Sequence, residues 1–176
     1  MTVGPATHGQ GVFAAKRFRP GQVIGEIEGI LHKDPDYGSN YCINVGGNCS
    51  LEPHEPFRFL NHCCEPNAKL YIVYIHESDP IEERKAVVEA LKNIQPGSEI
   101  LIDYEWAADA AIRCGCGAAN CRGWIVDPAE LHIVKKRLAD QNASKTHTMT
   151  ADHAIAISSV ATLNCGRLNC ATLFLS

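Results

Sequence analysis

The chain has 176 residues, a formal net charge of −4 and an apolar fraction of 45%, values typical of a single soluble globular domain. No long basic run is present, so we expect no direct contact with nucleic acid. The first eight residues do not resemble a secretory signal, and Arg167 and polar residues interrupt the apolar stretch 154–175. We therefore expect no membrane contact and an intracellular location, in the nucleus or the cytoplasm.

The nine cysteines are numerous for a chain of this length. In a reducing compartment, cysteines are more often metal ligands or reactive thiols than disulfides. An odd number also argues against a closed set of disulfides. The cysteine content therefore favours a metal site.

Residues 1 to about 106 contain short β-like runs, such as 22–27, 70–75 and 86–90, separated by turn sequences at 19–21 and 95–97. This pattern predicts a mainly β domain with short strands and not an alternating β-α fold. Within it, Gly9, Gln10 and Gly11 indicate only a close approach of the backbone to a neighbour. The helix and further glycine of a dinucleotide-binding loop are missing.

Two polar groups stand out in this β region. Asn61 and His62 precede the neighbouring Cys63 and Cys64, and alone this pair fits a polar turn with its hydrogen bonds satisfied. The apolar run 99–102 ends in an acid and Tyr104, which alone fits a tyrosine packed in the core. Each segment alone therefore favours a structural role.

Residues 107–126 hold a dense cysteine cluster, with Cys114, Cys116 and Cys121 within eight positions. Three thiolates so close in sequence can converge on a tetrahedral zinc ion, which in structural sites takes four ligands. The fourth must come from elsewhere, and the cysteines at 63 and 64 are candidates. The alternative is a set of buried cysteines without a metal.

A helix is predicted over 127–140. Asp127 suits its N-cap, Pro128 its first turn and Glu130 the acid of a capping box. Its apolar face comprises Leu131, Val134 and Leu138. Residues 141–152 read as a polar linker, and the tail 141–176, including Cys165 and Cys170, has no predicted role.

Taken in this order, the segments resemble the SET-domain protein lysine methyltransferases. Residues 61–67 are similar to the family's Asn-His-Ser-Cys-x-Pro-Asn, and residues 99–104 to its Glu-Leu-x-x-Asp-Tyr. Residues 114–123 resemble its post-SET zinc segment, Cys-x-Cys-x4-Cys. The resemblance covers about 4–126 and implies a SET domain over 4–106 and a post-SET zinc segment over 107–126. It also implies a β-clip-like fold of small sheets around a pseudoknot, in which the Asn61 segment passes beneath a loop closed by the strand leading to Tyr104.

The activity implied by the resemblance is methyl transfer from S-adenosylmethionine to the side-chain amine of lysine in a protein or peptide, histones included. Tyr104 is then the catalytic residue, and Cys64 completes one structural Zn2+ site with Cys114, Cys116 and Cys121. The implied cofactor contacts are Gly9, Gln10, Gly11, Tyr41, Arg58, Asn61, His62 and Trp124.

Three positions differ from the family pattern. Ile27 replaces a second active-site tyrosine, Ile102 replaces a larger aromatic residue, and Cys63 replaces a serine. The smaller Ile102 predicts a pocket that admits more than one methyl group. Two alternatives stay open: a catalytically silent SET module that binds peptide, and a purely structural zinc protein. With little sequence before Gly9, we expect a minimal form without an attached reader domain, and no feature indicates an oligomeric state.

Overall fold

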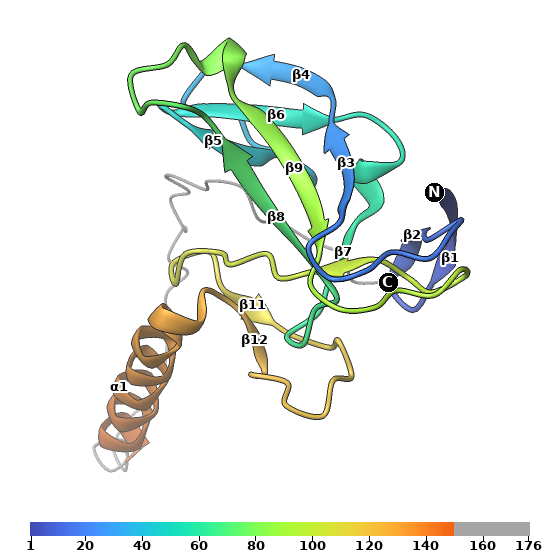
Figure 1. Cartoon of the computed structure of the whole chain (residues 1–176). Coiled ribbons are helices and arrows are strands. Elements are labelled where there is room, and N and C mark those ends of the chain that lie inside the picture. The colour runs from blue at the N-terminus through green and yellow to red at the C-terminus, as the bar shows by residue number, and fades with distance from the viewer. Residues whose placement is uncertain (150–176) are drawn as a thin grey trace.

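The fold is described here from a computed structural model, which covers the backbone of residues 1–149 and the side chains of residues 1–143. An N-terminal hairpin pairs β1 (Thr2–Ala6) with β2 (Gly9–Phe13). Two small sheets follow, both antiparallel, and Figure 1 shows them together at one end of the molecule. The first has the order β3 (Val23–Ile27), β9 (Lys85–Ala90), β8 (Ala68–Val73). The second has the order β4 (Gly29–His32), β6 (Cys49–Pro53), β5 (Ile43–Gly46).

A parallel pairing joins two segments that lie forty residues apart in sequence. Strand β7 (Asn61–His62) pairs with β10 (Leu101–Ile102), and the Cys63 N–H donates to the carbonyl of Ile102 at 2.8 Å. The side chain of Asn67 fixes this register, because its amide donates to the Glu99 carbonyl at 2.8 Å and accepts from the Leu101 N–H at 2.9 Å. Segments 61–67 and 99–104 are thus side by side, as the resemblance requires for a pseudoknot.

Residues 107–126, for which the name post-SET segment is kept from the resemblance, and the C-terminal helix lie at the opposite end of the molecule (Figure 1). Strands β11 (Ile112–Arg113) and β12 (Trp124–Ile125) form a short antiparallel pair. A 3-10 turn, η3 (Pro128–Glu130), leads into α1 (Leu131–Met149). Two further 3-10 turns are η1 (Phe57–Phe59) and η2 (Ile81–Glu83).

The apolar side chains form two separate cores. The larger core lies between the sheets and the 61–67 segment, and its members are Val12, Ala14, Phe18, Ile27, Phe57, Leu60, Ala68, Ala86, Val88, Ala90, Ile94, Ile100 and Ile102. The smaller core joins the post-SET segment to α1 through Ala108, Val126 and Val134. Leu131 and Leu138 pack against it, which confirms the predicted apolar face of the helix.

The helix differs from its prediction at both ends. The Asp127 carboxylate accepts from the Ala129 N–H at 2.8 Å, as predicted for a cap. Glu130, however, accepts from the Ala108 N–H at 2.6 Å and does not close a capping box. The predicted end at residue 140 is wrong, and so is the linker prediction for 141–149, because α1 continues to Met149. The stretch 141–149 contains no glycine or proline that would end a helix.

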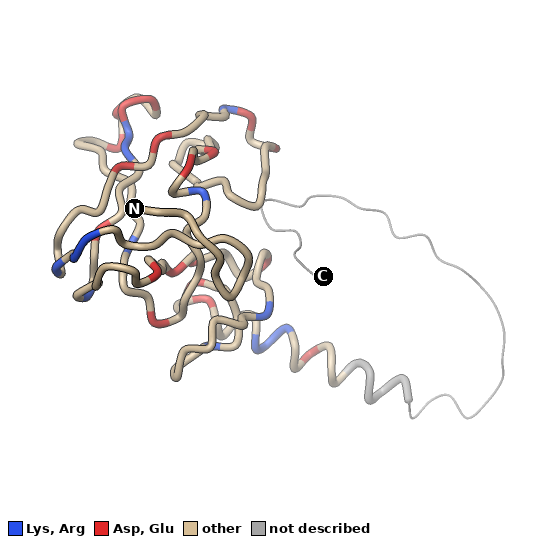
Figure 2. Tube along the Cα trace, turned by 90° about the vertical axis from the view of Figure 1, so that its right-hand side faces the viewer, with Lys and Arg blue, Asp and Glu red and all other residues tan. Residues whose placement is uncertain are grey.

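The mainly β architecture predicted from the sequence is confirmed. Acidic and basic residues are interspersed along the described trace, apart from two basic groups, at 16–19 and at 135–137 in α1 (Figure 2). Within residues 1–149, no helix has the length and apolarity needed to cross a bilayer. The apolar stretch 154–175, Cys165 and Cys170 lie outside the described residues.

Candidate active site

Tyr104 follows β10 and lies where the segments 61–67 and 99–104, called the knot below, meet. Its hydroxyl donates to the carbonyl oxygen of Leu60 at 2.7 Å. Its ring centroid lies 5.3 Å from those of His62 and Trp106, so aromatic rings enclose it on two sides. Burial raises the pKa of Tyr104 to about 12, and the nearby Glu99 adds to this shift. The hydroxyl is therefore protonated at neutral pH and can donate a hydrogen bond.

Asn61 connects the knot to the N-terminal hairpin. Its amide donates to the Gln10 carbonyl at 2.9 Å and to the Glu99 carboxylate at 2.8 Å. The same carboxylate lies so close to Gly11 that a Cβ there would overlap it, which explains the glycine. Gly9 has a φ of 78°, a conformation that glycine adopts without strain, and it forms the tip of the hairpin beside open space. The structure thus brings residues 9–11 and Asn61 together.

A small cavity of about 50 Å³ lies between the hairpin, the knot and the post-SET segment. Its lining is Thr7, His8, Asn61, His62, Glu99, Leu101 and Cys116. His8 Nε2 lies 3.1 Å from the carbonyl oxygen of Gly115, so the hairpin turn touches the post-SET segment directly. Three parts of the chain that are distant in sequence therefore meet at one site.

Tyr41 and Arg58 form a second contact near Tyr104. The Arg58 guanidinium lies 4.4 Å from the centroid of the Tyr41 ring and 3.5 Å from the Glu52 carboxylate. The side chain of Tyr41 is close enough to Tyr104 to help raise its pKa. The Arg58 side chain is held in place by a carboxylate and a ring, as a charged group that contacts a ligand must be.

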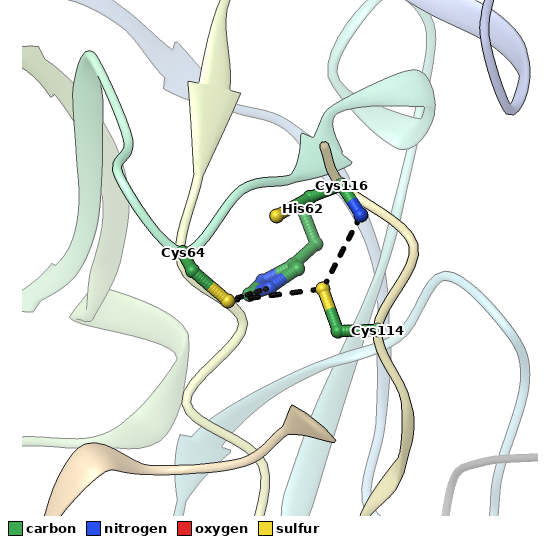
Figure 3. Close-up of side chains that lie close together, drawn as sticks. All are labelled: His62, Cys64, Cys114 and Cys116. Carbon is green, nitrogen blue, oxygen red and sulfur yellow. Dashed lines mark hydrogen bonds between the residues drawn. The ribbon is translucent and has the colours of Figure 1, made fainter. Parts of the chain in front are cut away.

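Side chains that can bind a metal converge where His62, Cys64, Cys114 and Cys116 meet (Figure 3), and Cys121 lies beside Cys64. Donor atoms of His62, Cys64, Cys114 and Cys116 all lie within 4.8 Å of one another. The Cys64 sulfur is 3.7 Å from that of Cys114 and 3.9 Å from that of Cys121. Four sulfurs at about 2.3 Å from a central zinc are about 3.8 Å apart. The two separations from Cys64 therefore match edges of a tetrahedral zinc site, although the group whose donor atoms all lie within 4.8 Å of one another contains His62 and not Cys121.

The hydrogen bonds of His62 decide between it and Cys121 as the fourth donor. The Tyr104 N–H, which can only donate, points at Nδ1 of His62 across 3.3 Å. Burial lowers the pKa of His62 to about 4, so the ring is neutral and its one proton belongs on Nε2. That nitrogen lies 3.4 Å from the Cys64 sulfur and donates to it. In that tautomer Nε2 has no lone pair for a metal, and Cys121 stays the predicted fourth donor.

A buried ion pair at this site was not predicted from the sequence. The Arg122 guanidinium contacts the two carboxylate oxygens of Asp103 at 2.7 and 2.8 Å, which raises the pKa of Arg122. Its Nη2 also donates to the Val126 carbonyl at 3.1 Å. Glu99, His8 and Trp106 were missed as well. For Glu99 and Asp103, the sequence offered one signal: each is an acidic residue next to the apolar run 100–102.

Trp124 lies away from the cavity. It packs against the smaller core, and the Arg113 guanidinium covers one face of its ring at 4.2 Å. Among the described residues, Trp106 is the tryptophan that contacts Tyr104. A contact between Trp124 and a cofactor stays a prediction. The replaced positions Ile27 and Ile102 are both buried in the larger core.

The raised pKa of Tyr104 predicts a loss of stability at alkaline pH. The folded pKa of about 12 exceeds the usual 10, so its contribution is complete below pH 10 and is lost as pH rises to 12. At about 1.4 kcal/mol per unit, the loss is about 2 to 3 kcal/mol. We expect the free energy of unfolding in urea to fall by that much more in the native chain than in Tyr104→Phe over this range. If the free energy of unfolding fell equally with pH in the native chain and in Tyr104→Phe, this prediction would be contradicted.

Comparisons with known proteins agree with this geometry. The SET domain family model matches residues 9–105, more than half of the chain. The H3 lysine-4 specific histone-lysine N-methyltransferase of Cryptococcus neoformans is 29% identical over 139 residues, which are 68% of this chain and 9% of that protein. The histone-lysine N-methyltransferase trithorax of Drosophila melanogaster is 28% identical over 133 residues, which are 67% of this chain and 3% of that protein.

A solved structure shows the same fold. The crystal structure of KRYPTONITE in complex with mCHH DNA, H3(1-15) peptide and SAH matches with a TM-score of 0.60 and 26% identity, over 70% of this chain and 29% of that one. The chain thus spans only a small part of the length of the proteins it matches. The match over residues 9–105, together with the shared fold, means that the chain belongs to the SET-domain family.

Proposed function

We propose that this chain transfers methyl groups from S-adenosylmethionine to the side-chain amine of lysine in a protein substrate. The observation that carries the proposal is the position of Tyr104. Its protonated hydroxyl is held against the Leu60 carbonyl, directly before the Asn61–His62 strand. The relatives named above are called histone-lysine N-methyltransferases, which supports the same reaction.

The residues around the small cavity suit the cofactor that we propose. Gly9 leaves the backbone open at the hairpin tip, whereas Gly11 is buried against Glu99. The hydrogen bonds of Asn61 hold the hairpin against the 99–104 segment. Glu99 puts a carboxylate beside the site, a charge that favours a cationic sulfonium. When bound, S-adenosylmethionine supplies an electrophilic methyl group. We assign Gly9, Gln10, Gly11, Tyr41, Arg58, Asn61 and His62 to its binding, and a contact with Trp124, which does not line this cavity, stays a prediction.

The amine must lose its proton before it can attack. Lysine in water has a pKa of about 10.4, so deprotonation near pH 7.4 costs about 4 kcal/mol. A dry site near a cation lowers that pKa, and no strong base is then needed. Tyr104 does not supply one, because a pKa of about 12 keeps its hydroxyl protonated. Its proposed role is to orient the amine, a positioning effect worth several kcal/mol.

The proposed substrate is a lysine in a histone tail. The KRYPTONITE structure contains an H3(1-15) peptide, and several relatives are named for H3 lysine 4. Such a substrate would place this protein in the nucleus. We propose no nucleic-acid contact for the chain itself, because acidic residues interrupt its basic residues over most of the described trace (Figure 2).

The test is methyl transfer to an H3 tail peptide from labelled S-adenosylmethionine, followed by mass spectrometry. We expect transfer by the native chain and a loss of about a hundredfold or more in Tyr104→Phe, because the amine is no longer oriented. Tyr71→Phe is the matched control, because it also loses one tyrosine hydrogen bond, to Glu89 at 3.1 Å in β9. A peptide with arginine in place of lysine shows that lysine is the acceptor.

Three results would contradict this assignment. Full activity of Tyr104→Phe would remove Tyr104 from the chemistry. Tight binding of S-adenosylmethionine without any transfer by the native chain would support a silent, peptide-binding SET module. Absence of cofactor binding would support a purely structural zinc protein.

We also propose that Cys64, Cys114, Cys116 and Cys121 hold one structural zinc ion. Four thiolates leave the ion no open position for water, so it takes no part in the chemistry. Its effect is to tie residues 114–121 to Cys64, next to the strand that carries Asn61 and His62.

Metal analysis distinguishes the candidate ligands. We expect one zinc per native chain and a clear loss in Cys121→Ser, because one of four thiolates is removed. Cys63→Ser is the matched control, since Cys63 is a buried neighbour that we do not assign as a ligand. Zinc absorption spectra should show only sulfur donors at about 2.3 Å. Full zinc content in Cys121→Ser, or a nitrogen donor, would favour His62 instead.

A further inference from the structure

We propose that Arg122 is a positioning residue for methyl transfer, which acts through Asp103 on His62 and Tyr104. The inference rests on the proposed function and deepens it. Arg122 directly follows Cys121, and Asp103 directly precedes Tyr104. The ion pair between them therefore connects the proposed zinc site with the proposed catalytic residue without passing through a thiol.

The ion pair has the geometry of a strong and oriented contact. Two guanidinium nitrogens of Arg122 meet the two oxygens of Asp103 at 2.7 and 2.8 Å. The two side chains are only 14% and 12% exposed. A bidentate pair shielded from water is directional and fixes both partners. Arg122 is itself anchored, because its Nη2 donates to the Val126 carbonyl in the smaller core at 3.1 Å.

Asp103 carries the connection on to the catalytic residue. Its Oδ1 lies 3.4 Å from Nδ1 of His62, a side chain that is 4% exposed. The same Nδ1 accepts from the Tyr104 N–H at 3.3 Å, and the two rings lie 5.3 Å apart. If the Asp103 carboxylate moves, its contact with His62 changes, and so does the hydrogen bond between His62 and the backbone of Tyr104. In a reaction governed by positioning, a shift of about 1 Å costs about a hundredfold.

The first test is hydrogen exchange of the Tyr104 amide, followed by NMR on zinc-loaded protein. In Arg122→Ala we expect this amide to exchange about tenfold faster, because its acceptor is disturbed. Arg17→Ala is the matched control, since Arg17 is an exposed arginine that donates to Asn93 far from the site. Faster exchange confined to residues 112–126 would show that Arg122 only braces the post-SET segment, and would overturn the proposal.

If Arg122→Ala fails to fold or loses zinc, Asp103→Asn tests the same link from outside the zinc segment. It nearly preserves the shape of the side chain and removes its charge, and we expect the same faster exchange of the Tyr104 amide. Unchanged exchange in Asp103→Asn would overturn the proposal. Because no transfer is measured, this result is independent of the proposed function.

Kinetics supply the second test. We expect Arg122→Ala to lower kcat about tenfold with little change in the KM for cofactor, and Arg122→Lys to recover part of the loss. In a double variant with Asp103→Asn, removal of Arg122 should add little, because the two residues act as a unit. The proposal would be contradicted if the losses of kcat in the two single variants multiplied in the double variant. It would also be contradicted if Arg122→Ala changed the KM and left kcat unchanged. A native chain without transfer would instead reject the proposed function.

Discussion

The site depends on the contact between Cys64 and the thiols at Cys114 and Cys121, which lie fifty residues or more further along the chain. Their separations of 3.7 and 3.9 Å match the edges of a zinc tetrahedron. A structural zinc contributes about 10–16 kcal/mol, whereas one hydrogen bond contributes about 1 kcal/mol. A zinc ion bound there would therefore outweigh contacts such as His8 with Gly115 in ordering residues 107–126.

Backbone pairing and a buried ion pair position the remaining residues of the site. The parallel pairing of β7 with β10 sets Asn61 beside the hairpin and Tyr104 beside Leu60. The pair between Arg122 and Asp103 then aligns the post-SET segment with Tyr104. The proposed reaction uses no general base, so its rate depends on how well these groups are positioned.

The sequence predicted the parts of the site that short motifs contain. Spacing alone indicated a metal with one ligand missing, and the resemblance assigned that ligand to Cys64, whose sulfur does lie beside those of Cys114 and Cys121. Long-range contacts were not predictable. Nothing local marks Glu99 as the acceptor for Asn61, or Asp103 as the partner of Arg122, because both pairs depend on how distant segments cross. The length of α1 was underestimated because a polar composition without glycine or proline also suits an exposed helix.

We propose that a zinc ion held by thiolates organises the cofactor site through the segment around Cys64. This dependence can be measured by calorimetric titration of S-adenosylmethionine into zinc-loaded and zinc-depleted protein. We expect binding to the zinc-loaded protein, loss of binding after chelation of the metal, and recovery when zinc is restored. Equal affinity in the two forms would contradict it, because the cofactor site would then form without the metal.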